Sequence, residues 1–163
     1  MSFYVPLHVH SEYSLLDGLS QTKHIASRLE EIESPACALT DHGNVSGAID
    51  FNKTVGKSFK AIMGCELYLC EQEATVKSPE NSKLKHQVVL AKNLDGWKKL
   101  LSIVSSSNLP EHFYYKPRTS FEQLMLLAAE DQGNLISFSG HLGSVLANVV
   151  LDNVNWKEEG CRE

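Results

Sequence analysis

The sequence has no long hydrophobic run and little cysteine, and each shortage excludes a class of protein. The longest apolar stretches, residues 124–129 and 145–151, are too short to cross a bilayer, which needs roughly 20 apolar residues. The four cysteines form no Cys-x-x-Cys pair and are too sparse for a disulfide scaffold, so we expect reduced thiols. Residues 1–9 lack the features of a signal peptide. We therefore expect a cytoplasmic protein with no membrane partner.

Basic charge is also scarce. The 163 residues include 15 Lys and Arg against 20 Asp and Glu, which gives a net charge of −5. Such a balance argues against a protein that holds duplex DNA through a broad electrostatic surface. Hydrophobic residues make up 42% of the chain and charged residues 21%, as in an ordinary folded domain. Any contact with nucleic acid is therefore expected to be local.

Short apolar runs alternate with helical patterns, which is typical of strand–helix–strand units around a largely parallel sheet or barrel. We predict one domain at residues 1–155, a polar tail at 156–163, and a mobile, hairpin-like excursion at 71–85. The pattern predicts strands at 4–9, 36–40, 61–69, 86–91 and 135–139, and helices at 22–32, 47–55, 94–104 and 120–129. It does not decide between an open sheet and an incomplete barrel.

Histidines and carboxylates fall at or beside the ends of these predicted strands. His8 and His10 are two residues apart on the first strand, so both imidazoles are expected on the same face. Gly18 permits a tight turn that could return Asp17 toward them. The later strands add further candidate ligands, namely Asp41, His42, Glu66, His86 and His141.

Imidazoles and carboxylates without thiolates suit Zn²⁺, Mn²⁺ or Fe²⁺. The candidates exceed the needs of one ion, which indicates two or three ions that share bridging carboxylates, as in phosphate-ester hydrolysis. Each residue also has a plainer interpretation. A lone histidine is usually a surface or structural residue, as we expect for His24 and His112, and Glu66 could face water at a sheet edge. The joint placement at strand ends favours the metal site.

Residues 7–18, Leu-His-Val-His-Ser-Glu-Tyr-Ser-Leu-Leu-Asp-Gly, resemble the opening motif of the polymerase and histidinol phosphatase (PHP) family. The similarity is greatest to the branch found in bacterial DNA polymerase III alpha subunits. It implies an α/β fold, here an incomplete, distorted (β/α)₇ barrel of the TIM-like kind. It continues along nearly the whole chain, through residues 38–44, 64–66, 86–93, 114–118 and 139–142.

The resemblance also implies a site and an activity. Asp41 would orient an imidazole and, with Arg118, assist catalysis. From their side-chain chemistry alone, Lys116 and Arg118 could hold a phosphate, and Tyr114 or Tyr115 could stack on an unpaired base, although aromatic residues before a proline are more often packing residues. The implied enzyme is a 3′-to-5′ exonuclease of DNA replication that uses two or three divalent ions (Mn, Zn or Fe) on a DNA 3′ end or nucleotide phosphate. The implied metal ligands are His8, His10, Asp17, His42, Glu66, His86 and His141.

The chain departs from the family pattern in places. His141 stands where the polymerase relatives usually have Cys, and Val145 where they tend to have Glu. No Asp-x-His pair follows His141, and the catalytic aspartates of a polymerase palm are absent, so we expect no DNA synthesis. Two alternatives stay open: a non-catalytic remnant that stabilises or binds a polymerase, and a small-molecule phosphatase. We expect the remainder of a polymerase alpha subunit, or a second chain, to complete the barrel.

Overall fold

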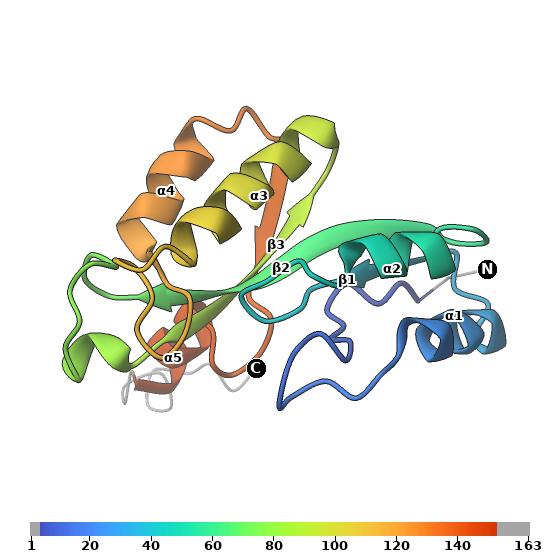
Figure 1. The fold of residues 1–163 in the computed structure, drawn as a ribbon, viewed down its shortest axis with the longest axis horizontal. Helices are drawn as coiled ribbons and strands as arrows, with labels where there is room; N and C mark the ends of the chain where they lie inside the picture. Colours follow the sequence, from blue (N-terminus) through green and yellow to red (C-terminus); the bar gives the residue numbers. More distant parts are fainter. Residues whose placement is uncertain (1–3, 153–163) are drawn as a thin grey trace, which may run out of the picture.

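The computed structural model describes residues 4–152, which form a mixed α/β fold around a five-stranded sheet (Figure 1). Helices α3 and α4 lie together over one part of the sheet, and α1 and α2 lie at the other end of the molecule (Figure 1). The predicted tail at 156–163 lies outside the described residues. The strands are β1 (Ala36–Leu39), β2 (Lys60–Cys70), β3 (Lys85–Ala91), β4 (Thr119–Ser120) and β5 (Leu135–Phe138). The helices are α1 (Thr22–Glu31), α2 (Ala48–Thr54), α3 (Leu94–Ser107), α4 (Phe121–Ala129) and α5 (Val145–Asp152), with a 3₁₀ turn at Glu80–Ser82.

The long strand β2 lies at the centre of the sheet. Its first half pairs in parallel with β1, and its second half pairs antiparallel with β3, where Tyr68 lies opposite His86. Strand β5 pairs antiparallel with β3, and β4 joins the end of β2 in parallel. The prediction of a largely parallel sheet is therefore wrong. The connection between β2 and β3 contains no crossover helix, so the chain turns back as a hairpin rather than crossing over.

The antiparallel course of β3 decides which residues meet. An antiparallel strand begins where its neighbour ends, so His86 near the start of β3 lies beside the last part of β2. Strand β5 runs antiparallel to β3 in turn, so the chain that follows it emerges at the same end of the sheet. An isolated parallel bridge between His42 and Glu66 extends the β1–β2 pairing toward that end as well.

Residues 4–10 run beside β1 without forming a regular strand, so the prediction of a strand at 4–9 is wrong. The backbone N–H groups of Ala38 and Thr40 donate to the carbonyls of Pro6 and Val9, both at 2.9 Å. Pro6 has no N–H to donate in return, and the N–H of Val9 donates to the hydroxyl of Thr40 at 3.0 Å. The segment is thus extended, but its backbone hydrogen bonds to β1 and Thr40 are not continuous.

Alternate residues of β2 face two different environments. Its odd-numbered side chains, Cys65, Leu67 and Leu69, are buried against Leu100 and Ile103 of α3. Its even-numbered residues point to the opposite face, because strand side chains alternate. A second cluster joins α1, α2 and β1. The core under α3 and α4 therefore fixes which side of β2 presents Glu66.

The predicted helices are present with small shifts at their ends. Ser120 caps α4, because its hydroxyl accepts a hydrogen bond of 3.1 Å from the backbone N–H of Gln123. Asn93 caps α3 in the same way through the N–H of Gly96. Helix α5 was not predicted. Among the described residues, no helix is long and apolar enough to cross a membrane.

Candidate metal centre

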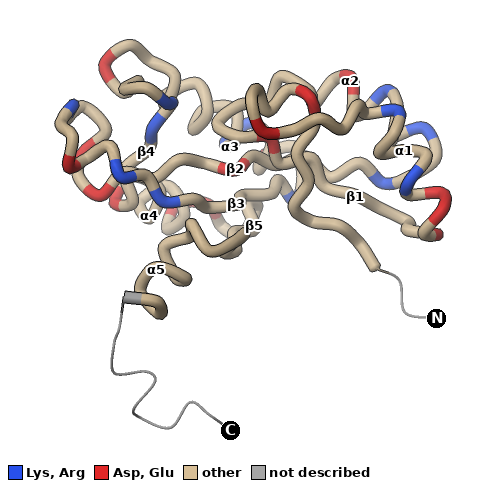
Figure 2. The backbone as a smooth tube through the Cα atoms, turned by 90° about the horizontal axis from the view of Figure 1, so that it is seen from below, with Lys and Arg blue, Asp and Glu red and all other residues tan. Residues whose placement is uncertain are grey.

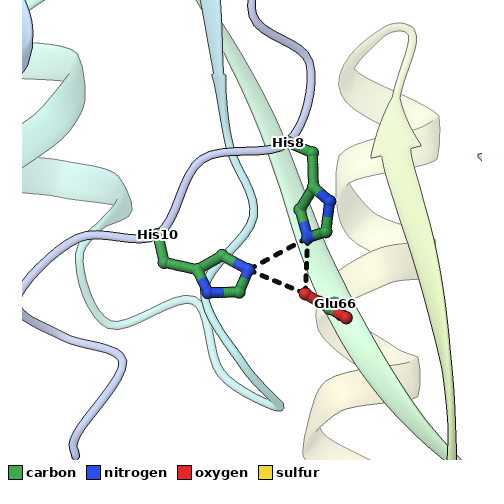
Figure 3. Close-up of side chains that lie close together, drawn as sticks. All are labelled: His8, His10 and Glu66. Carbon is green, nitrogen blue, oxygen red and sulfur yellow. Dashed lines mark hydrogen bonds and ion pairs between the residues drawn. The ribbon is translucent and has the colours of Figure 1, made fainter. Parts of the chain in front are cut away.

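The structure brings all seven residues expected as ligands into one cluster, with Glu66 at its centre. The Glu66 carboxylate is fully buried, with 0% of the residue exposed. Its Oε2 atom lies 2.6 Å from His8 Nε2 and 2.7 Å from His10 Nε2 (Figure 3). Its Oε1 atom lies 2.8 Å from His86 Nδ1 and 2.7 Å from His141 Nε2. One carboxylate thus contacts four imidazoles, two on each oxygen.

Asp17 and His42 complete the cluster. The Asp17 carboxylate contacts His10 Nδ1 and lies 3.3 Å from His42 Nε2, which is 3.8 Å from Glu66 Oε2. The chain returns Asp17 to this position through a tight turn that passes close to Ser11. A Cβ atom at Gly18 would lie 2.0 Å from the Ser11 carbonyl oxygen, so only glycine fits there. The predicted turn at Gly18 is confirmed.

Burial and charge shift the pKa values in this cluster in different directions. Burial would raise the pKa of Glu66, but hydrogen bonds with the surrounding imidazoles outweigh it and hold this pKa far below its usual range. Burial would lower the pKa of His10, yet Glu66 and Asp17 together raise it. Burial lowers the pKa of His42 to about 4, because the charge of Glu66 offsets only part of the effect. The cluster therefore combines an ionised carboxylate with imidazoles of unequal basicity.

The donor set fits divalent metal ions. Ligand atoms in each of three groups lie within 4.8 Å of one another, and these groups are His8–His10–Glu66, His10–Asp17–His42 and His42–Glu66–His86. The Nε2 atoms of His8 and His10 are only 3.0 Å apart and face the same Glu66 oxygen. A bound cation accepts a lone pair from each such nitrogen, so this convergence is typical of a metal site. Glu66 has an oxygen for each imidazole pair and could bridge two ions.

Asp41 does not orient an imidazole, contrary to the prediction. Its buried carboxylate accepts hydrogen bonds from the backbone N–H of Ser11 at 2.7 Å and from the hydroxyls of Ser11 and Ser14 at 2.9 and 2.8 Å. The Ser14 hydroxyl also accepts from the backbone N–H of His42 at 3.1 Å. Asp41 thus ties the loop that carries Asp17 to the end of β1. It acts on the cluster by positioning its ligands.

The two basic residues expected to hold phosphate lie in different environments. Lys116 is exposed, and its Nζ atom lies 5.3 Å from the centre of the Tyr68 ring, beside His42. Arg118 is fully buried, so the expectation that it binds phosphate or assists catalysis is wrong. Its guanidinium group is committed to four backbone carbonyls, those of Ala74, Val76, Asn81 and His112.

Tyr68 is a site residue that the sequence reasoning missed. Its ring stacks on His42, with centroids 5.4 Å apart and an interplanar angle of 14°. Burial and the charge of Glu66 raise the pKa of Tyr68 to about 12, so its hydroxyl stays protonated at neutral pH. The buried Nδ1 atom of His42 has no hydrogen-bond partner among residues 4–152, so the ring is held by the contact of its Nε2 atom with Asp17 and by packing against Tyr68. The available signal was spacing, because Tyr68 lies two residues after Glu66 on one strand.

These features define the class of protein: an α/β domain with a histidine-rich centre suited to divalent ions. Residues 6–162 match the family model for the PHP domain, and the chain belongs to that family. DNA polymerase III subunit alpha of Treponema pallidum is 42% identical over 154 residues, which cover 93% of this chain. The corresponding subunit of Borreliella burgdorferi is 38% identical over 159 residues and 94% of this chain. The chain spans only 13% of the length of either relative.

Two solved structures show a weaker likeness, from which no functional detail follows. A protein from Bifidobacterium adolescentis described as a metal-dependent phosphoesterase is 13% identical, with a TM-score of 0.45 over 63% of this chain and 32% of that one. An amidohydrolase from Chromobacterium violaceum is 21% identical, with a TM-score of 0.43 over 63% of this chain and 34% of that one.

Proposed function

We propose that this chain is a metal-dependent phosphoesterase of the 3′-to-5′ exonuclease type that acts on DNA 3′ ends during replication. The observation that carries the proposal is the Glu66 carboxylate with two imidazoles on each oxygen and with Asp17 and His42 beside it. This donor set suits two or three ions of Mn, Zn or Fe. Kinship with DNA polymerase III alpha subunits supports a DNA substrate and a cytoplasmic location in or beside such a polymerase.

The residues of the chain would hold and arrange this centre. Divalent ions bound to such ligands lower the pKa of water and neutralise charge on phosphoryl oxygens. Glu66 holds its two imidazole pairs together, and Asp17 links His10 to His42. Lys116 adds an exposed positive charge next to the cluster, suited to a phosphate oxygen. Lys116 would thus bind the phosphate, whereas Glu66, Asp17 and the histidines on other segments would hold the ions.

We also propose that the sheet is part of an incomplete (β/α)₇ barrel of the PHP type. The face of the sheet that carries Ile62, Leu90 and Phe138 is apolar, and Ile136 on the same face is 49% exposed. An exposed apolar face at a sheet edge favours a further covering element. The remainder of a polymerase alpha subunit, or a second chain, would supply the missing strands.

The test combines metal analysis with a digestion assay. We expect the purified chain to contain Mn, Zn or Fe and to shorten a 3′-mismatched primer from its 3′ end, and we expect a chelator to stop this digestion. His10→Ala and His42→Ala should abolish it, whereas His24→Ala, on the exposed surface of α1, should not.

Three other outcomes would contradict the proposal. Metal binding without any digestion would indicate a non-catalytic module. Hydrolysis of p-nitrophenyl phosphate without action on the primer would indicate a small-molecule phosphatase. Digestion that survives both His10→Ala and His42→Ala would indicate a contaminating nuclease.

A further inference from the structure

A pocket of about 700 Å³ adjoins the candidate metal centre and includes His42 in its wall. Three loops line it, residues 12–15 on the segment that leads to Asp17, residues 42–46 after β1, and residues 113–117 before β4. The volume is in the range of pockets that bind small molecules of nucleotide size. Its lining includes four aromatic residues, Tyr13, Tyr68, Phe113 and Tyr115.

The loop that carries Tyr115 is held in a strained conformation. Tyr115 has φ of 60°, in the left-handed region that bulky residues rarely adopt. The N–H of Tyr114 donates to the carbonyl of Lys116 at 3.1 Å and closes the turn, and the buried Arg118 packs over the Tyr114 ring at 5.2 Å. The Tyr115 residue nevertheless stays 76% exposed. Strained residues of this kind cluster at ligand contacts and active sites, so an exposed ring held in this way is a candidate ligand contact.

Positive charge lies close to this exposed ring. Lys116 follows Tyr115 directly, and its Nζ atom lies over Tyr68, which stacks on the candidate ligand His42. Glu12 belongs to another loop of the pocket, so an anionic group would be repelled there and drawn to the Lys116 side. An aromatic ring beside one cation suits a base and its phosphate. The candidate metal centre next to them would then lie at the phosphodiester to be cut.

We propose that this pocket binds the unpaired terminal nucleotide of a single strand, with its base on the Tyr115 ring and its phosphate at Lys116. The inference rests on the proposed function and names the substrate contact of that site. An unpaired end fits better than a duplex, because the basic positions in residues 4–152 lie in separate groups with acidic positions between them and form no continuous band in the view of Figure 2.

The experiment measures binding of a short 5′-fluorescein-labelled oligothymidylate by anisotropy, with phosphorothioate linkages that resist digestion so that the protein keeps any bound metal. Tyr115→Asn removes the ring but suits the left-handed backbone, and we expect it to weaken binding about tenfold. Tyr115→Phe keeps a stacking face and should bind as the wild type does. Lys116→Ala should reduce the slope of log affinity against log salt by about 0.7, the value for one phosphate contact on a single strand. Lys57→Ala is the control, since Lys57 is exposed and precedes the other end of β2.

The outcomes separate this inference from the proposed function. The pocket assignment would be overturned if Tyr115→Asn bound as tightly as the wild type, or if the wild type did not bind at all. It would also be overturned if Lys116→Ala and Lys57→Ala lost the same amount of salt slope. Binding with the expected variant pattern but without any metal-dependent digestion would uphold the pocket and overturn the exonuclease. Digestion that needs His10 yet is indifferent to Tyr115→Asn and Lys116→Ala at subsaturating substrate would overturn the pocket alone.

Discussion

Replacing Arg118 with alanine should destabilise the chain rather than weaken phosphate binding. The guanidinium group is fully buried and donates to four backbone carbonyls, three of them in the connection between β2 and β3. A hydrogen bond from a charged donor contributes roughly 1.5–3 kcal/mol. Some of the freed carbonyls would regain water and the losses are not additive, so we expect a total loss of about 3–5 kcal/mol.

Urea unfolding followed by tryptophan fluorescence measures this loss. With an m-value of about 2 kcal/mol/M, the midpoint should fall by about 1.5–2.5 M. Lys116→Ala is a closely matched control, because Lys116 is exposed and only two residues away, and it should change stability by less than about 0.5 kcal/mol. Arg118→Lys keeps the charge but not the planar fork of donors, so it should recover only part of the loss.

One pair of results would refute this reasoning. If Arg118→Ala unfolds at the wild-type midpoint while its affinity for the oligothymidylate drops, the guanidinium group binds phosphate and does not hold the loop. The structural role requires the opposite pattern. In the milder Arg118→Lys variant, stability should fall while metal content and the salt slope of binding stay at their wild-type values.

Three further predictions concern the metal centre and its pocket. A chelator should lower the unfolding midpoint and added Mn²⁺ should restore it, since an ion that binds only the native state at 100 times its Kd stabilises by about 2.7 kcal/mol. Metal affinity should fall as pH drops through the raised pKa of His10, because that imidazole has to lose its proton first, and calorimetry in two buffers should detect the released proton. His42, with a pKa of about 4, should add a second decline only near that pH. Tyr115→Gly should raise stability by about 1 kcal/mol through relief of backbone strain, yet weaken oligothymidylate binding.

Only part of the candidate ligand cluster could be predicted from local spacing in the sequence, because its other contacts join segments far apart in the chain. His8 and His10 share a face in any extended segment, and the turn at Gly18 returns Asp17 toward them. His86 is the instructive exception. In a parallel sheet, a residue at the start of a strand would lie at the opposite end of the sheet from Glu66. The prediction of His86 as a ligand was therefore inconsistent with the predicted parallel topology. The antiparallel course of β3 removes the inconsistency.

The errors arose where a side chain depends on distant segments. Lys116 and Arg118 look equivalent in sequence, and only the folded-back connection between β2 and β3 supplies carbonyls that bury one of them. Asp41 bonds to Ser11 and Ser14, about 30 residues earlier, and these hydroxyls take the place of the imidazole expected there. Neither partnership leaves a periodic pattern that a sequence could reveal.

Strand β2 links the stability of the fold to the geometry of the candidate metal centre. Cys65, Leu67 and Leu69 are buried against the helices, and Glu66 and Tyr68 therefore face the imidazoles. A register slip of one residue would exchange the two sets, so packing against α3 and α4 is what keeps the carboxylate at the site. In return, burial of Glu66 would be costly without the imidazoles around it. Packing of β2 against the helices buries the negative charge of Glu66, and the surrounding histidines stabilise that charge. The same close approach of imidazoles and a carboxylate is what a divalent ion requires.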